Sequence, residues 1–155
     1  MRHLGPSLVA ATLLGSIAVV SAAEPASYVC NGKQAIGFSM DKSTHAWAPA
    51  QFNARQYVIR VPKRGPDQPS GAETAVFAVY EVGGKGDFGP LFCNAGFNKA
   101  GYLRCDGLGD TFLFNRQTLR FEHWLPYGYV DPPGSFWSPE GSTTPFIEIG
   151  TCAAI

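Results

Sequence analysis

Residues 105–121 read CDGLGDTFLFNRQTLRF, and they repeat the pattern of residues 30–47, which read CNGKQAIGFSMDKSTHAW. Both segments begin with Cys-[Asn/Asp]-Gly and continue with Phe-x-[Met/Phe]-[Asp/Asn]-[Lys/Arg]-x-Thr-x-x-aromatic. Each is followed by an apolar stretch containing threonine, then by glycine and then by cysteine. The sequence therefore indicates an internal duplication, with repeat halves at about 28–93 and 102–152.

The repeated polar residues are typical of turns. Asn-Gly and Asp-Gly readily take the positive φ angles of a two-residue hairpin turn, so Cys30 and Cys105 are each expected to end a strand just before a reversal. Asp41 and Asn115 begin a second turn, in which the Asx side chain bonds to the backbone two residues on. A catalytic role for Asp41 is disfavoured, because its counterpart Asn115 cannot exchange a proton.

Short strands are predicted from alternation and β-branching over residues 56–61, 74–82, 102–105, 111–115, 119–123 and 145–149. In the repeats, Phe38 with Met40 and Phe112 with Phe114 are spaced by two, so each pair is expected to face the inner side of a strand. Residues 62–71 and 131–143 have the composition of loops. The predicted fold is all-β, a small antiparallel barrel or sandwich with a pseudo-twofold repeat. A barrel is preferred, because closure removes edge strands.

The N-terminus has the layout of a secretory signal peptide. A basic start at Arg2 precedes an apolar run over residues 8–20, and small residues follow at 21–23. This run is shorter than the roughly 20 residues of a membrane-spanning helix. We expect residues 1–23 to be the signal, with cleavage after Ala22 or Ala23, and residues 24–155 to form a single β domain. No cysteine near the junction could carry a lipid anchor.

The charge balance of the remaining chain argues against nucleic acid as a partner. Loss of Arg2 leaves eleven basic residues against twelve acidic ones. A phosphate backbone requires a basic excess that this chain lacks.

Four cysteines in an exported chain favour two disulfides. The duplication allows one bridge within each half, or bridges that join the halves, Cys93 with Cys105 and Cys30 with Cys152. In a closed barrel the end of each half lies beside the start of the other, which favours the second scheme. A metal site is disfavoured, because no Cys-x-x-Cys spacing occurs.

The sequence contains no strong catalytic motif. After cleavage only His45 and His123 remain, and neither lies in a hydrolase or zinc motif. An acid-base cluster of Glu122, His123 and Asp131 is conceivable but has no visible partner geometry. The sequence therefore favours a non-enzymatic protein, and we expect no cofactor or metal.

A group of aromatic residues near the C-terminal loop is the main candidate for binding. Exposed aromatics stack on sugar rings or fill pockets of protein partners, whereas buried ones would close the end of a barrel. The candidate residues are Trp124, Tyr127, Tyr129, Phe136 and Trp137.

Several short motifs carry a family resemblance. They are Tyr-x-Cys at 28–30, Thr-Leu-Arg-Phe at 118–121, Gly-Tyr-Val at 128–130 and Thr-Pro-Phe-Ile-Glu-Ile-Gly-x-Cys at 144–152. With these the chain resembles a group of short secreted proteobacterial proteins without assigned activity, which implies an exported β domain. It shares less with periplasmic inhibitors of c-type lysozyme, since their Ser-Gly-x-x-Tyr signature is absent.

We therefore expect a periplasmic or extracellular binding or envelope-associated module, with a protein or glycan of the cell envelope as its partner. The alternatives are a protein inhibitor of a hydrolase such as lysozyme, and a small glycan-processing enzyme. A cavity lined by paired acidic groups would favour the enzyme, a protruding rigid loop the inhibitor, and a shallow aromatic patch the binding module.

Overall fold

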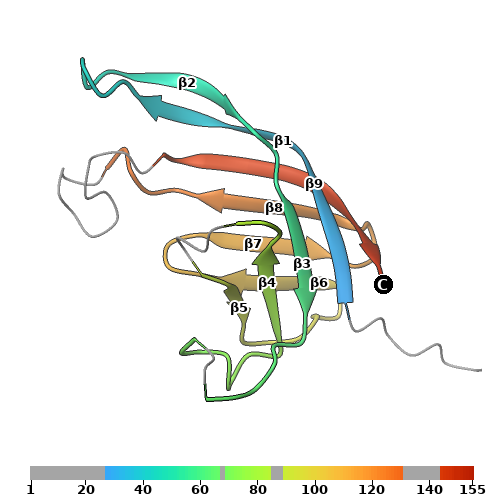
Figure 1. The fold of residues 1–155 in the computed structure, drawn as a ribbon. Coiled ribbons are helices and arrows are strands. Elements are labelled where there is room, and N and C mark those ends of the chain that lie inside the picture. Colours follow the sequence, from blue (N-terminus) through green and yellow to red (C-terminus); the bar gives the residue numbers. More distant parts are fainter. Residues whose placement is uncertain (1–26, 67–68, 85–88, 131–143) are drawn as a thin grey trace, which may run out of the picture.

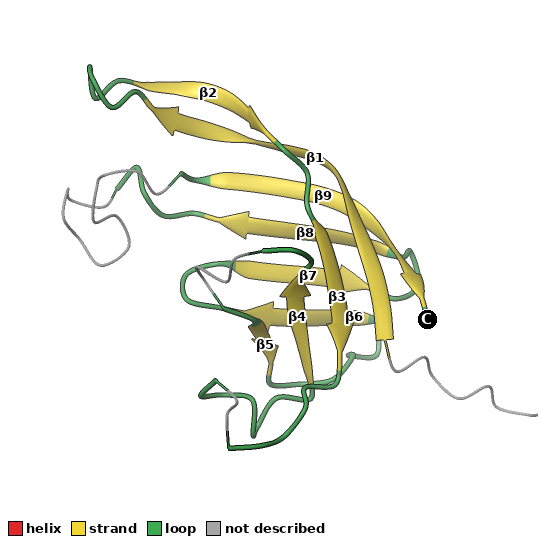
Figure 2. Cartoon of the chain, in the orientation of Figure 1, coloured by secondary structure: helices red, strands yellow, loops and turns green. Residues whose placement is uncertain are grey.

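The computed structural model describes residues 27–66, 69–84, 89–130 and 144–155, and the regular structure in them is all β (Figure 2). The predicted class is confirmed. No helix in these residues is long and apolar enough to cross a membrane. The nine strands of the described residues are β1 (Ser27–Met40), β2 (Trp47–Phe52), β3 (Gln56–Arg60), β4 (Phe77–Glu81), β5 (Leu91–Cys93), β6 (Tyr102–Asp106), β7 (Thr111–Asn115), β8 (Arg120–Leu125) and β9 (Phe146–Ala154).

The strands close into an antiparallel barrel, which confirms the preference for a barrel over a sandwich. Neighbours follow the order β1-β3-β4-β5-β6-β7-β8-β9, and β9 pairs back with β1. β1 is 14 residues long, so its first part pairs with β3 and its second part with β2. The far ends of β1 and β2 consequently project from the barrel as a hairpin (Figure 1).

The predicted reversal after Cys30 is wrong. β1 runs through Asn31 and Gly32, and only a register shift against β9 between Gly32 and Gln34 marks the place. Gly32 pairs with Gly150 on one side and donates its N–H to Arg55 O on the other, at 2.8 Å, so neighbours on both sides hold the chain extended. The predicted reversal after Cys105 is confirmed, because β6 ends at Asp106 and the chain returns as β7. The predicted two-residue turn is wrong, since Gly107 donates its N–H to Asp110 O at 2.9 Å and the positive φ of 111° belongs to Gly109.

The two Asx turns form as predicted. The Asp41 carboxylate accepts the N–H groups of Ser43 and Thr44 at 2.8 and 2.9 Å, and Asn115 Oδ1 accepts the two equivalent N–H groups at 2.8 and 3.2 Å. The fifth residue of each turn, His45 and Leu119, has a positive φ of 57° and 55°. Bonds from the Ser43 hydroxyl and these N–H groups lower the pKa of Asp41 to about 2. Asp41 therefore serves as a turn residue.

The core lies inside the barrel and is rich in aromatics. Phe112 and Phe114 on β7 are fully buried, as predicted. Phe38 does not face inward as predicted, because it lies on the projecting part of β1 and is 50 % exposed. The register shift between Gly32 and Gln34 reverses the alternation of β1, so Ala35 is buried and Phe38 faces the outer surface.

Both disulfides have the pairing that the sequence favoured. Cys30 bonds to Cys152 and Cys93 bonds to Cys105, and the described residues contain no free cysteine. In the barrel Cys30 and Cys152 face each other across β1 and β9, so closure itself brings them together. Two disulfides indicate an oxidising location outside the cytoplasm.

The predicted strand positions agree best with the structure at β7 and β3. Residues 111–115 coincide with β7, and residues 56–61 with β3 to within one residue. β4 is shorter than residues 74–82, since Ala75 donates its N–H to Gly71 O in a turn at 3.2 Å. β2 contains Pro49 and β5 has three residues, and neither was predicted. The predicted loop at 131–143 lies outside the described residues.

Candidate functional site

A chain of buried polar side chains crosses the interior of the barrel. The Tyr57 hydroxyl donates to Glu148 Oε2 at 2.6 Å and lies 2.9 Å from His123 Nδ1. On the far side of the imidazole, His123 Nε2 lies 2.8 Å from Asp110 Oδ2. At the other end, Arg55 donates its backbone N–H to Glu148 Oε1 at 2.7 Å. We call Asp110, His123, Tyr57 and Glu148 the buried relay.

The hydrogen bonds of the buried relay determine its charge. Tyr57 has a single proton and gives it to Glu148, so His123 Nδ1 must donate its proton to the tyrosine oxygen. The contact between His123 and Asp110 needs one further proton, carried by either the imidazole or the carboxyl group. In both arrangements the four side chains together carry one negative charge. The buried relay is thus an ionised unit inside an aromatic core.

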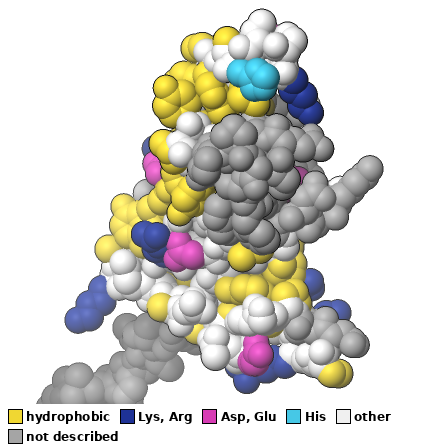
Figure 3. All heavy atoms as spheres, turned by 90° about the vertical axis from the view of Figure 1, so that its left-hand side faces the viewer, with side chains coloured by type: hydrophobic (Ala, Val, Ile, Leu, Met, Phe, Trp, Pro, Cys, Tyr) yellow, Lys and Arg dark blue, Asp and Glu magenta, His cyan; other side chains and the backbone are white. Residues whose placement is uncertain are grey.

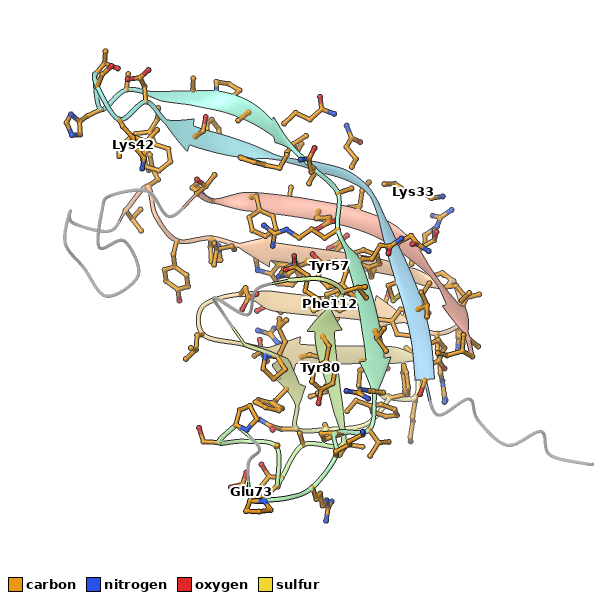
Figure 4. All side chains as sticks on the ribbon, viewed as in Figure 1. Lys33, Lys42, Tyr57, Glu73, Tyr80 and Phe112 are labelled. Atoms are coloured by element: carbon orange, nitrogen blue, oxygen red, sulfur yellow. A yellow bond between two sulfur atoms is a disulfide. The ribbon has the colours of Figure 1, made fainter. Side chains whose placement is uncertain are left out.

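Tyr57 is the central residue of the buried relay. Its ring packs edge-on against Phe112 at 5.3 Å and against Phe121 at 5.6 Å, and Figure 4 shows Tyr57 and Phe112 pointing into the barrel. Burial, reinforced by the hydrogen bond to Glu148, raises the pKa of the Tyr57 hydroxyl well above its usual value. Tyr57 therefore stays a neutral donor in the folded protein.

The repeated Cys-[Asn/Asp]-Gly glycines make room for the two carboxylates. A Cβ at Gly32 would overlap Glu148 Oε1 and the backbone of Arg55, and a Cβ at Gly107 would overlap Asp110 Oδ1. Neither glycine has a positive φ, so space rather than backbone conformation requires them. Asp110 Oδ1 is buried without a hydrogen-bond partner, so the relay is less well satisfied at this end than at Glu148.

Replacing Gly32 with alanine is therefore expected to lower the free energy of unfolding by about 1 to 3 kcal/mol, the usual cost of overpacking a core. Gly65 is the matched control, because a Cβ there meets no atom within 4 Å. Chemical denaturation of both variants measures the effect. Equal stabilities for the two variants would show that Glu148 moves aside without cost.

The buried relay does not form an open active site. Glu148 is fully buried, Tyr57 is 1 % exposed and His123 is 3 % exposed, so a substrate has no access to them in this conformation. The conceivable cluster of Glu122 and His123 is not formed, because the two residues alternate on β8 and only His123 faces the core. Asp131 lies outside the described residues. In the described part of the chain, no group of three or more His, Cys, Asp and Glu side chains could hold a metal ion.

The outer surface of the barrel carries a continuous apolar area. Ile36 on β1 lies opposite Ile147 on β9, and Ile147 lies opposite Trp124 on β8. Phe38 and Ile149 extend this area along β1 and β9. Figure 3 shows hydrophobic side chains gathered at the upper end of one face, over the projecting end of β1 and β2. We call Ile36, Phe38, Trp124, Ile147 and Ile149 together the apolar face.

An open groove of about 650 Å³ lies beside the apolar face, where β1, β2, β8 and β9 meet. Its walls include Ile36, Phe38, Pro49, Pro126, Phe146 and Ile147. Among the described residues that line it none is ionisable, and Gln51 supplies the one polar side chain. Gly37 at the base allows the β9 backbone to approach closely, because a Cβ there would overlap Pro145 O.

Three of the five predicted aromatic residues are described by the structure. Trp124 is half-buried in the apolar face, Tyr127 is 37 % exposed and Tyr129 is 66 % exposed. Tyr129 contacts Trp47 of β2 edge-on at 5.5 Å, which connects this segment to the projecting hairpin. Phe136 and Trp137 lie outside the described residues.

The sequence pattern contained one signal for the buried relay that the prediction missed. Glu148 stands between Ile147 and Ile149 in a strand that alternates, so an acidic residue had to share a face with Phe146. This signal points to a buried carboxylate but does not identify its partners.

The scan against protein-family models, the search of curated proteins and the search of solved structures each found no match.

Proposed function

We propose that this protein is a non-enzymatic binding module, periplasmic or secreted, whose apolar face and groove hold a protein partner. The observation that carries the proposal is the uncharged groove of about 650 Å³ bordered by exposed large apolar side chains. The signal-like N-terminus supports export and agrees with the two disulfides. The internal duplication and the likeness to short secreted proteobacterial proteins belong to the same proposal.

The apolar face is larger than the barrel needs for stability. Ile36, Phe38, Ile147 and Ile149 are 48, 50, 42 and 46 % exposed, while the interior has its own aromatic core. Single exposed apolar residues are ordinary, but contiguous ones mark interaction sites on soluble proteins. The area is therefore best explained by a partner that covers it.

The form of the groove favours a protein over a small ligand. Small-molecule sites enclose most of the ligand surface, whereas this groove is open to solvent. Its lining, as far as the structure describes it, also lacks the basic residues with which proteins attach to anionic membranes. An apolar segment of an extracytoplasmic protein fits both properties.

The exposed edge of β2 favours side-chain contacts over the addition of a strand. Phe38 donates its N–H to Pro145 O at 3.0 Å, so the backbone groups of its partner Pro49 point away from β1. Proline has no N–H, and the free edge of β2 consequently lacks a donor in its middle. A partner would therefore pack on the apolar face rather than extend the sheet.

A second candidate function is inhibition of a hydrolase, favoured by the projecting β1–β2 hairpin. The Asp41 carboxylate accepts three hydrogen bonds within the turn, from Ser43 N, Ser43 Oγ and Thr44 N. The hairpin end is thus held rigidly and could enter a cleft. A lysozyme-type hydrolase is one partner to test, and inhibition assays with the mature protein address it directly.

The proposed function predicts that polar substitution of the apolar face removes partner binding without unfolding the barrel. The double variant Ile36→Ser/Phe38→Ser is expected to weaken binding at least about thirtyfold, since truncating one hot-spot residue costs about 2 kcal/mol. Val82→Ser is the control, because Val82 is similarly exposed but lies outside the groove. The measurement is quantitative capture from an envelope extract by immobilised wild type, variant and control, followed by affinity measurement with the purified partner. A protein retained equally by all three would refute the proposal.

Alanine at the aromatic residues extends this test. Tyr129→Ala is expected to leave the melting temperature unchanged, and a loss of binding would place Tyr129 in the contact. Trp124→Ala is expected to lower stability as well, because Trp124 is half-buried against its neighbours. Loss of stability at every aromatic position would instead place the whole group in the core.

A further inference from the structure

A second hollow of about 490 Å³ lies on the outer surface, toward the opposite ends of β8 and β9 from the apolar groove. Its volume is in the range of sites for small ligands, about 300 to 1,000 Å³. Among the described lining residues it shares none with the apolar groove, and Ile149 of the apolar face lies at its border. It is therefore a separate candidate site, and the proposed function neither requires nor explains it.

Strand register builds the hollow from two rows of side chains. One row crosses β6 to β9 as Tyr102, Asn115, Arg120 and Thr151, and the other crosses β7 to β9 as Leu113, Glu122 and Ile149. Apart from Asn115, which is itself buried, these residues alternate with the buried members of the same strands and face outward. The barrel wall thus supplies a rigid floor.

The charges of the hollow are not compensated by ion pairs. Lys33 lies at the register shift of β1, and its side chain points away from the strands in Figure 4. Among the described residues, neither Lys33, Arg120 nor Glu122 forms an ion pair. Two cations and one carboxylate leave a net positive charge over the hollow. An anionic group bound between Lys33 and Arg120 would supply the ion-pair partner that these two side chains lack.

The remaining lining residues suit a sugar. Tyr102 is 44 % exposed and offers a ring face, while Leu113 and Ile149 offer apolar contacts. Thr118 and Thr151 supply hydroxyl groups, and the Glu122 carboxylate accepts hydrogen bonds from ligand hydroxyls. An aromatic ring beside polar groups is a combination that binds ligands with both an apolar face and hydroxyls.

We propose that this hollow is a binding site for an oligosaccharide that carries carboxylate groups. Lys33 and Arg120 hold a carboxylate, Tyr102 stacks against a sugar ring, and Glu122 with the threonines binds hydroxyls. The ligand class follows from the uncompensated cations together with the exposed ring. A bare anion would leave the ring of Tyr102 without a contact, and a neutral sugar would leave the two cations without an ion-pair partner.

The test uses trigalacturonate as the probe and neutral maltotriose as its counterpart, with the mature, disulfide-bonded protein. Calorimetric titration is expected to show binding of trigalacturonate at least tenfold tighter than of maltotriose, and weaker binding as salt screens the charges. The variant Lys33→Gln/Arg120→Gln is expected to lose at least tenfold in affinity, and Tyr102→Ala is expected to lose a similar factor. The control Lys63→Gln changes an exposed lysine outside the hollow and is expected to bind normally.

Three results would overturn the proposal. One is equal binding of the two trisaccharides, and another is unchanged affinity in Lys33→Gln/Arg120→Gln with a wild-type melting temperature. The third is binding of inorganic phosphate or citrate as tightly as trigalacturonate, which would reduce the hollow to an anion site. Partner capture by the apolar face is measured separately with Ile36→Ser/Phe38→Ser, so either proposal can fail alone.

Discussion

Replacing Tyr57 with phenylalanine is expected to lower the free energy of unfolding by about 2 to 6 kcal/mol. The ring and its contacts with Phe112 and Phe121 remain, and only the hydroxyl is lost. Glu148 Oε2 then loses its donor and His123 Nδ1 loses its acceptor inside the barrel. Each buried group left unsatisfied costs about 1 to 3 kcal/mol.

Tyr80→Phe is the matched control for this measurement. Tyr80 is half-buried, it lies under the Arg60 guanidinium at 4.5 Å, and its hydroxyl forms no hydrogen bond among the described residues. Its loss is expected to change stability by less than about 0.5 kcal/mol. Chemical denaturation compares the two variants. Equally small effects would mean that the buried relay contributes little to stability.

The raised pKa of Tyr57 gives the same prediction a second readout. Below the ordinary tyrosine pKa of about 10, Tyr57 is protonated in both states, and its contribution to stability is fully present. As pH rises above 10, the unfolded state loses this proton while the folded state keeps it, so stability falls. The stability difference between wild type and Tyr57→Phe is therefore expected to shrink above about pH 10. A constant difference would contradict the assignment.

Removal of the Cys30–Cys152 disulfide is expected to be the other large effect. This bridge spans 122 residues and the Cys93–Cys105 bridge spans 12. Loop-closure entropy in the unfolded chain corresponds to about 5 kcal/mol for the long loop and about 3 kcal/mol for the short one. The long bridge also joins β1 to β9, the pair of strands that closes the barrel.

The experiment compares the double variants Cys30→Ala/Cys152→Ala and Cys93→Ala/Cys105→Ala. Both variants lose one pair of buried sulfur atoms, so each serves as the control for that loss in the other. Denaturation midpoints at 25 °C give the ranking, and non-reducing peptide mapping verifies the remaining bridge. A larger loss in the variant without the short bridge would show that closure of the long loop does not dominate.

Those parts of the fold that depend on neighbouring residues could be predicted from the sequence. The Asx turns at Asp41 and Asn115 form because an Asx side chain reaches N–H groups only two and three residues away. β7 was located correctly because Phe112 and Phe114 are spaced by two and both face the core. The disulfide pairing followed from closure of the barrel, since closure places the ends of the chain side by side.

The candidate sites could be predicted only in part. Trp124 and Tyr129 were named as candidates from their residue type, and the structure places Trp124 opposite Ile147 and Tyr129 against Trp47. Phe38 was assigned to the core because its spacing matches that of Phe112. Spacing specifies that two residues share a face, but it does not reveal the register shift between Gly32 and Gln34 that turns this face of β1 outward.

The sequence by itself determined the β class, the positions of the Asx turns and the cysteines available for pairing, because these depend on local conformation and on residue type. Tertiary structure alone decided which polar groups meet in the core. Tyr57 and Glu148 are 91 residues apart, and Tyr57 and His123 are 66 apart, so their hydrogen bonds exist only once β3, β8 and β9 surround the same interior. Closure also decided that Gly32 serves as space for the Glu148 carboxylate, since that carboxylate reaches Gly32 only when β1 pairs with β9.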